Sequence, residues 1–519
     1  MPAAHQGLIV RFSVTVLTNL LRAGCSFASG MLLARGLGAS GYGDLSFLLG
    51  SFAAVNQLLD LGTSTAFFTF IALRRRSAAL LALYGGWLAL QFVVLLALVG
   101  ILLPQPVIQR LWLGHQQGIV LVACVSSFLT TQVWTAVSYI GEAVRKTLTV
   151  QAAAVGQAAL HLVAIAIGAW HGWLTVPVVL WLLVAEYLLL TMVVGSYLVR
   201  EHLGCDDGAR ESIGTLVREF IVYCKPLVVY SWIGCVYAFA DQWLLQRFGG
   251  AEQQGFFAVA QQFTVFSLLL TTSMLKVFWK EVAEARERGN HQRVQRLYLG
   301  TARGLYGAGV WLSCLLIPYS RELLQMLLGP GYAASWLCLA ILLFYPVHQS
   351  LGQIGGTYFY ATKQTRAYAR IGLGMMTLSL PVTYGLLASP SALVPGLGLG
   401  AVGLAIKLVV LQIIGVNMQA AVMVRADGFA YSFKEQVITL ASFLGLGWAC
   451  KSASILLIGL AAPVRLPLAV IAVGGLLYLA ASAALLIRYP ERLGLTRDQL
   501  QGIVPILRGK MASLRGASA

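Results

Sequence analysis

Long apolar segments follow one another along almost the whole chain and are separated by short polar stretches. A helix needs about 20 apolar residues to cross the hydrocarbon core of a bilayer, and each of these segments is long enough. The connections are too short to hold a soluble domain, and the longest are 200–218 and 276–297. We therefore predict fourteen membrane-spanning helices, near 8–33, 44–71, 78–103, 117–140, 148–170, 174–199, 219–246, 254–275, 298–318, 333–361, 369–388, 399–423, 436–459 and 465–487.

The composition agrees with a polytopic all-α membrane protein. Of the 519 residues, 58% are hydrophobic and only 11% are charged, a balance far from that of soluble globular chains. The first apolar segment carries Arg22 near its centre and lacks a small-residue cleavage site, so we expect a retained helix and not a signal peptide. The eight cysteines form no Cys-x-x-Cys pair, and neither a disulfide framework nor a metal site is expected.

Lysine and arginine are distributed unevenly over the loops. With the N-terminus in the cytoplasm, 25 of them fall on the cytoplasmic side, and the outer side has five, which are Arg35, Arg110, Arg247, Arg321 and Arg465. Positive residues accumulate on the cytoplasmic side of membrane proteins. We therefore predict a multi-pass protein of the cell (inner or plasma) membrane with both termini cytoplasmic. Orientation and anionic lipids then explain the net charge of +17, and nucleic acid is not expected as a partner.

Two polar stretches have the pattern of helices that lie along the membrane surface. In the loop 276–297, mixed charges surround Gly289-Asn290, a pair that ends helices, and we predict two short interfacial helices there. The C-terminal tail, 489–519, has a similar amphipathic pattern and is expected on the cytoplasmic side.

One nine-residue pattern occurs after the first and again after the seventh predicted span. Residues 35–43 and 247–255 both fit Arg-x-x-Gly-Ala-x-x-x-Gly, with Arg35 and Gly38 matching Arg247 and Gly250. The starts at 35 and 247 are 212 residues apart, which predicts a duplicated half of about six spans, as in many transporters. We divide the chain accordingly into an N-lobe (1–200), a cytoplasmic linker (201–218), a C-lobe (219–424), two further spans (425–488) and the tail.

The first predicted span carries a polar stripe. Its members recur at steps of three and four residues and therefore share one helix face; they are Arg11, Thr15, Thr18, Arg22, Ser26 and Ser29. A charge near the middle of the bilayer costs about 2.5–3.5 kcal/mol on insertion scales, so it is expected to face protein or water. Because Arg22 is too deep to reach the membrane surface, we interpret it as lining an aqueous lumen. Hydrogen bonding of Ser and Thr between helices is the structural alternative.

Other polar residues inside the spans have two interpretations each. Lys225 and Arg303, near the cytoplasmic ends of the seventh and ninth spans, are either contacts for an anionic headgroup or anchors of their spans. Asp60 in the second span and Asp241 in the seventh are either sites of ion coupling or members of structural ion pairs. Gln349 and Gln353 are four residues apart on the tenth span, and their amides suit sugar hydroxyls as well as bonds between helices.

Four segments resemble the lipid-linked oligosaccharide flippases of the multidrug/oligosaccharidyl-lipid/polysaccharide exporter superfamily, the type that moves O-antigen or exopolysaccharide repeat units. The segments are 33–43 after the first span, 240–245 (Ala-Asp-Gln-Trp-Leu-Leu), 328–332 (Leu-Gly-Pro-Gly-Tyr) and the amphipathic loop after the eighth span. Together with the number of spans, this resemblance covers nearly the whole chain.

The resemblance implies two six-helix lobes arranged as a V around a central cavity, with the last two spans outside them. A polyprenyl-pyrophosphate-linked glycan is expected to enter from the cytoplasmic leaflet and to cross by alternating access, its headgroup held by Arg22, Lys225 and Arg303. Such cations suit a pyrophosphate. The resemblance further implies a transporter with no cofactor, which acts as a monomer on the glycan lipid, contacts membrane lipids and is open to polysaccharide assembly proteins. Coupling to H⁺ or Na⁺ through Asp60 or Asp241 is compatible with it.

Three alternative functions stay open at this point. A multidrug exporter of the same superfamily would favour an acidic cavity, whereas basic groups outnumber acidic ones inside these spans. A peptidoglycan-precursor flippase would need similar substrate chemistry. A membrane glycosyltransferase, ligase or polymerase would need a larger outer loop, and we find no paired-carboxylate, HExxH, GxSxG or P-loop pattern in a suitable context.

Overall fold

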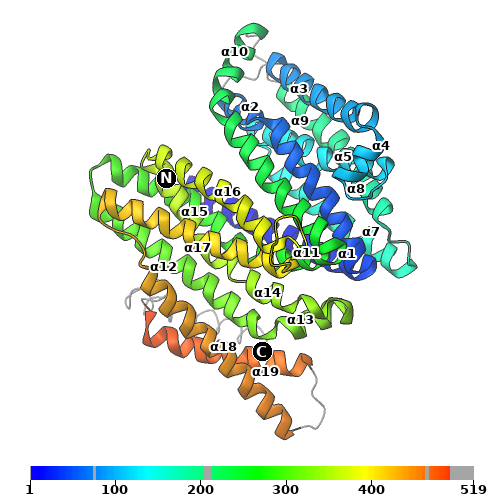
Figure 1. The fold of residues 1–519 in the computed structure, drawn as a ribbon. Helices are drawn as coiled ribbons and strands as arrows, with labels where there is room; N and C mark the ends of the chain where they lie inside the picture. The colour runs from blue at the N-terminus through cyan, green and yellow to red at the C-terminus, as the bar shows by residue number, and fades with distance from the viewer. Residues whose placement is uncertain (1, 74–77, 204–211, 462–466, 491–519) are drawn as a thin grey trace, which may run out of the picture. The chain divides into compact units, whose positions relative to one another are not determined.

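The computed structural model describes residues 2–73, 78–203, 212–461 and 467–490, and every regular element in these ranges is a helix (Figure 1). The predicted tail beyond 490, the Arg74–Arg76 cluster, Arg210, Arg465 and the side chain of Arg11 lie outside the described part. The elements of the first 227 residues are α1 (Pro2–Asp60), α2 (Thr63–Leu73), α3 (Ala78–Ala97), η1 (Leu98–Leu102), α4 (Gln105–Leu111), α5 (Gln117–Phe128), η2 (Leu129–Val133), α6 (Trp134–Ala143), α7 (Thr147–His171), α8 (Val176–Leu190), η3 (Thr191–Gly195), α9 (Ser196–Leu203), α10 (Ile213–Cys224) and η4 (Lys225–Leu227).

The remaining elements are α11 (Val228–Glu287), α12 (His291–Leu316), η5 (Ile317–Tyr319), α13 (Ser320–Leu328), η6 (Pro330–Ser335), α14 (Trp336–Leu342), α15 (Tyr345–Ala361), α16 (Thr365–Leu387), α17 (Gly400–Asp427), α18 (Phe433–Ala461) and α19 (Pro467–Arg488). The elements η1 to η3 are π-helical and η4 to η6 are 3₁₀ turns.

Many of these helices are long and apolar enough to cross a membrane. Among the described residues nine qualify: 78–102, 117–143, 147–171, 176–203, 213–264, 330–361, 400–427, 433–459 and 467–488. A tenth candidate is the pair 17–60 and 63–72, which bends by 59° at its break. The multi-pass helical class is thus confirmed, whereas the number of fourteen spans stays a prediction. Two predicted spans merge in α1 and two in α11, and α12 and α16 are not among these candidates.

The repeated pattern forms the same local structure in both places. Gly38 interrupts α1 with φ 69° and ψ 175°, and Gly250 interrupts α11 with φ 77° and ψ 177°. Only glycine adopts this combination without strain, so each long helix is two helices joined at the fourth residue of the pattern. Arg35 and Arg247, the first residues of the two copies, are both exposed.

The two copies of the pattern also lie against each other. A Cβ atom built on Gly43 would lie 1.7 Å from the carbonyl oxygen of Ala251, and one built on Gly255 would lie 2.0 Å from that of Ala39. Gly43 corresponds to Gly255 in the pattern and Ala39 to Ala251, so the contact is reciprocal, as a two-fold relation requires. The last glycine of the pattern is therefore needed for close approach of the backbones.

A second pair of contacts obeys the same relation. Gly30 lies against the side chain of Gln262, and Gly50 lies against that of Gln242. Gly30 and Gln242 are 212 residues apart in number, as are Gly50 and Gln262. Segments around 30–50 and 242–262 therefore pack symmetrically on each other.

The chain divides into two compact units. The first comprises 1–262 and 376–404, and the second comprises 263–375 and 405–519, so that α11, α16 and α17 each contribute to both. Within the first unit α1 packs on α5, α7 and α8, and α2 packs on α6 and α10. The predicted lobes follow the repeat instead, and their boundaries stay a prediction.

The second unit has a continuous apolar core. It is built on α12, which packs against α15 and α18, and α18 in turn packs along α19 (Figure 1). Buried aromatic side chains dominate its centre, among them Tyr306, Tyr358, Phe359, Phe443 and Tyr478. The last two helices thus belong to this core and are not loose additions.

The turn at Gly289-Asn290 agrees with the predicted helix stop, but the flanking helices differ from the prediction. Gly289 has a left-handed φ of 67°, and the side chain of Asn290 accepts a hydrogen bond of 2.9 Å from the backbone N–H of Arg293, which caps α12. The residues on either side are the end of α11 and the start of α12. The expectation of two short separate helices is therefore wrong, because each segment is continuous with a long helix.

Candidate functional site

The second predicted span is broken in its middle. Helix α1 ends at Asp60, Leu61 and Gly62 have positive φ values of 48° and 83°, and α2 begins at Thr63. The Asp60 carboxylate accepts hydrogen bonds from the Ser64 N–H (2.8 Å), the Ser64 hydroxyl (2.9 Å) and the Thr63 hydroxyl (3.2 Å). Asp60 therefore caps the N-terminus of α2, where a negative charge is favourable.

A second break lies against the first. The 3₁₀ turn Lys225–Leu227 joins α10 to α11 and contains Pro226, which cannot donate a backbone hydrogen bond. A Cβ atom on Gly62 would lie 2.5 Å from the Leu227 side chain, so the two breaks are in close contact. The result is that Lys225 is exposed at a point where two interrupted helices meet.

A pocket of about 480 Å³ opens beside these breaks, entirely within the first unit. Its walls come from α2, α3 and α10 and from the start of α11. They are almost wholly apolar, and Lys225 is their one cation. The lining residues are Leu61, Thr63, Leu83, Tyr84, Trp87, Val217, Phe220, Ile221, Cys224, Lys225 and Val228. Such a volume lies within the range of small-ligand pockets, about 300–1,000 Å³.

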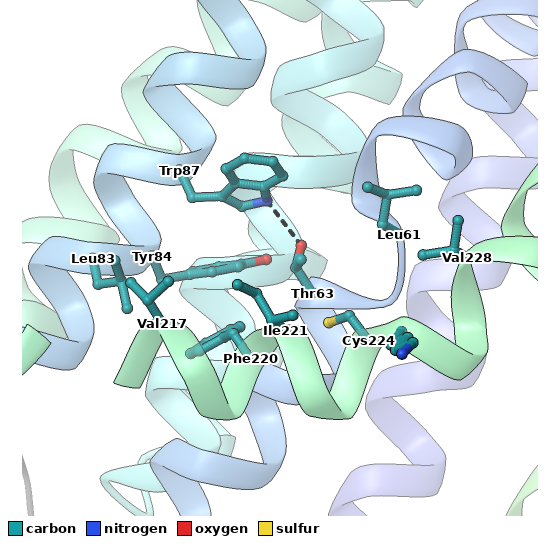
Figure 2. Close-up of a pocket in the computed structure, with 11 residues that line it drawn as sticks. Leu61, Thr63, Leu83, Tyr84, Trp87, Val217, Phe220, Ile221, Cys224 and Val228 are labelled. Atoms are coloured by element: carbon teal, nitrogen blue, oxygen red, sulfur yellow. Dashed lines mark hydrogen bonds between the residues drawn. The ribbon is translucent and has the colours of Figure 1, made fainter. Parts of the chain in front are cut away.

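Few polar groups reach the pocket, and most have partners (Figure 2). The Trp87 indole donates a hydrogen bond of 3.1 Å to the Thr63 hydroxyl, which itself donates to Asp60. The Tyr84 ring stacks on Phe67 with a centroid distance of 4.0 Å, and its hydroxyl end points toward Thr63. That hydroxyl is buried and has no hydrogen-bond partner among the described residues. A buried donor without a partner is costly, so this atom calls for an explanation.

Arg22, the residue expected in a cationic lumen, is exposed on α1. On the same stripe, the Thr18 hydroxyl donates to Gln151 of α7 at 3.4 Å, and Arg22 itself is within electrostatic reach of Tyr187 of α8. Both interpretations of the stripe thus have a geometric basis, because Thr18 bonds between helices while no described residue forms an ion pair with Arg22. Arg22 and Lys225 both belong to the first unit.

Arg303, the third expected cation, lies in the second unit and is paired. Its Nε and an Nη bond the two carboxylate oxygens of Glu435 at 3.0 and 3.1 Å, which links α12 to α18. A bidentate salt bridge of this kind is strong and directional. Its charge is therefore already compensated, and the anchoring interpretation of Arg303 has the better geometric support.

Asp241 and the two glutamines also have neighbours within the protein. Asp241 is buried on α11 and accepts a hydrogen bond of 2.9 Å from the Thr383 hydroxyl of α16. Beside Gln349 and Gln353, the small Gly352 of α15 leaves room for Gln412 of α17. These contacts suit packing between helices, and the roles in ion coupling and sugar binding stay predictions.

One polar cluster between α7 and α8 was not predicted from the sequence. His161 of α7 bonds the carboxylate of Glu186 of α8 through Nδ1 at 3.0 Å, and Gln157 donates to the same carboxylate at 3.0 Å. Glu186 is buried. The signal was present, since Gln157 and His161 are four residues apart on one face and Glu186 is an isolated carboxylate in an apolar run. It ties α7 to α8.

By its fold this is a multi-pass helical membrane protein. Residues 8–278, slightly more than half of the chain, match the family described as "Polysaccharide biosynthesis protein", and the chain belongs to this family. A comparison with curated proteins gives no match. The predicted resemblance to polysaccharide flippases is confirmed at this level.

Solved structures show the same fold. The "Lipid II flippase MurJ, inward closed conformation" is 13% identical, with a TM-score of 0.67 over 92% of this chain and 99% of that one. A "multidrug resistance MATE family transporter of the MOP superfamily" is 13% identical, with a TM-score of 0.59 over 78% and 95%. The MATE multidrug transporter DinF-BH is also 13% identical, with a TM-score of 0.53 over 81% and 96%. At this identity the likeness concerns the fold alone.

Proposed function

We propose that this protein is a flippase that moves a polyprenyl-pyrophosphate-linked oligosaccharide from the cytoplasmic to the outer leaflet of the cell membrane, for the synthesis of a surface polysaccharide. Membership of the polysaccharide biosynthesis family supports the substrate class. The shared fold supports a transporter as opposed to an enzyme.

The observation that carries the proposal is the presence of two exposed cations in one unit, Arg22 on α1 and Lys225 in the turn between α10 and α11. A cation in a membrane-spanning segment is costly unless it faces protein, water or an anion. Neither side chain has an ion-pair partner among the described residues. A pyrophosphate is a strong partner for both, since charge-assisted bonds gain strength in a low-dielectric environment.

In the proposed cycle, the lipid-linked glycan enters from the cytoplasmic leaflet, on the side where the loop charges predict both termini. Arg22 and Lys225 hold the pyrophosphate while the sugars occupy the aqueous lumen. The membrane-spanning lobes then change their orientation and release the headgroup on the outer side.

The test is translocation of a fluorescent polyprenyl-pyrophosphate-linked glycan in proteoliposomes by the wild type, Arg22→Ala and Arg110→Ala. Arg110 is an exposed arginine of α4 in a predicted outer loop and serves as the matched control. We expect Arg22→Ala to lose most of the rate and Arg110→Ala to keep it. Equal rates for both variants would contradict the role of Arg22, and transport of a cationic dye in place of the glycan would favour a drug exporter.

A further inference from the structure

We infer that the pocket between α2, α3 and α10 binds the isoprenoid chain of the lipid carrier next to its phosphate, with the phosphate bonded to Lys225. This inference rests on the proposed function and deepens it, because it assigns a place to the lipid part of the substrate that is separate from the glycan. It concerns only residues of the first unit.

The residues that line the pocket are complementary to a ligand that is apolar along most of its length and anionic at one end. Its walls are aliphatic and aromatic, with Leu83, Trp87 and Phe220 among them, and Lys225 is the one cationic residue among those that line it. A ligand that fills it must therefore be mostly hydrocarbon and must carry an anionic group at one end. A polyprenyl pyrophosphate has this construction, and the volume of about 480 Å³ can take only the part of a long chain that adjoins the phosphate.

The wall formed by α10 leaves the pocket within reach of the bilayer. Ile221 and Val217, which line the pocket, remain 61% and 37% exposed to the surroundings of the protein. On a membrane-spanning surface, apolar residues with this exposure face lipid tails. A chain can therefore slide in from the membrane without crossing a polar barrier.

Tyr84 brings a second polar group close to the pocket wall. Its side chain is only 3% exposed, and its hydroxyl points toward Thr63 and has no partner among the described residues (Figure 2). A phosphate-ester oxygen would accept the hydrogen bond that this donor lacks. The Asp60 carboxylate, which lies beside Thr63 of the pocket wall, is already bonded by Thr63 and twice by Ser64, which moderates its repulsion of a phosphate.

The experiment uses the full-length protein in proteoliposomes and a polyprenyl-pyrophosphate-linked glycan that carries a photoreactive diazirine in the isoprene unit next to the phosphate. We expect cross-links to residues of α3 and α10. Leu83→Trp should fill the pocket and reduce labelling about tenfold, the loss that corresponds to about 1.4 kcal/mol of binding. Leu90→Trp, the same exchange on an exposed residue of α3 outside the pocket, should label like the wild type.

Three further variants separate a loss of binding from a loss of folding. Lys225→Gln should weaken labelling, and Lys225→Arg, which keeps the charge, should label like the wild type. Tyr84→Phe removes only the hydroxyl, so it should weaken labelling while thermal stability stays at or above that of the wild type.

Three outcomes would overturn the inference. If the wild type translocates the glycan lipid but the label falls outside the pocket, the pocket assignment fails while the proposed function stands. If excess phospholipid competes as well as unlabelled polyprenyl phosphate, the site is a general lipid groove and the assigned occupant is wrong. If the wild type does not translocate the glycan lipid at all, the proposed function fails and this inference fails with it.

Discussion

Replacing Gly43 by alanine tests the reciprocal contact between the two copies of the repeated pattern. The new methyl group would lie 1.7 Å from the Ala251 carbonyl oxygen, whereas real Cβ atoms essentially never approach a heavy atom within 3.0 Å. The backbones must therefore separate locally by about 1.3 Å, the difference between these two distances. Forced overpacking of this kind costs roughly 1–3 kcal/mol.

The matched control is Gly24→Ala, which lies in α1 on the other side of the kink at Gly38. No atom lies within 4 Å of a Cβ at Gly24, and alanine is favoured over glycine inside a helix by roughly 0.5–1 kcal/mol. We therefore expect Gly43→Ala to lower, and Gly24→Ala to maintain or raise, the midpoint of thermal unfolding in detergent, followed by tryptophan fluorescence. Gly255→Ala should behave like Gly43→Ala, because its Cβ would lie 2.0 Å from the Ala39 carbonyl oxygen.

The reasoning would be refuted by a Gly43→Ala protein that unfolds at the same temperature as Gly24→Ala. It would also be refuted if Gly43→Ala were destabilising and Gly255→Ala neutral, since the two positions are equivalent in a two-fold contact.

Three further predictions concern the other unusual backbone and polar features. Gly38→Ala should lose about 1–3 kcal/mol of stability from backbone strain alone, because φ is 69° there while no atom crowds the position; normal stability in the same unfolding assay would argue against the turn. Asp60→Ala should lose about 0.5–2 kcal/mol through the lost cap of α2, and Asp60→Asn should retain most of the stability if capping is the role of this residue. His161→Ala and Glu186→Ala should each destabilise by about 1–3 kcal/mol, because each leaves a buried polar partner without its hydrogen bond; strictly additive losses in the double-mutant cycle with both alanines would contradict the pair.

Local signals in the sequence predicted much of the helical fold. Gly38, Gly250 and Gly289 mark turns at which only glycine is unstrained, and each of them has a positive φ in the structure. The helices themselves follow from apolar segments of sufficient length. What the pattern could not show is that Gly43 and Gly255 serve a different purpose from Gly38, because close approach depends on which helix packs opposite.

The candidate site was predicted only in part. Lys225 was recognised as a cation inside a span, but its pocket depends on Tyr84 and Trp87, which belong to a distant helix and look like ordinary apolar-run residues. The pair of Arg303 with Glu435 joins positions 132 residues apart, a distance at which the sequence carries no pairing signal. For Asp60 the signal was local, since Leu61-Gly62 followed by Thr63-Ser64 is a turn and a cap, yet the surrounding apolar run favours an unbroken span.

The central claim is that this protein carries a lipid-linked glycan across the membrane, and the leaflet distribution of that lipid tests it most directly. A polyprenyl-pyrophosphate-linked glycan with a fluorophore on the sugar is reconstituted in liposomes with the wild-type protein, and a membrane-impermeant reagent then bleaches the outer leaflet. We predict that nearly all of the fluorescence is lost over time with the protein, whereas protein-free liposomes keep the fraction in the inner leaflet. If the protein-containing liposomes keep this protected fraction with and without an H⁺ or Na⁺ gradient, the protein does not translocate this lipid and the account is wrong.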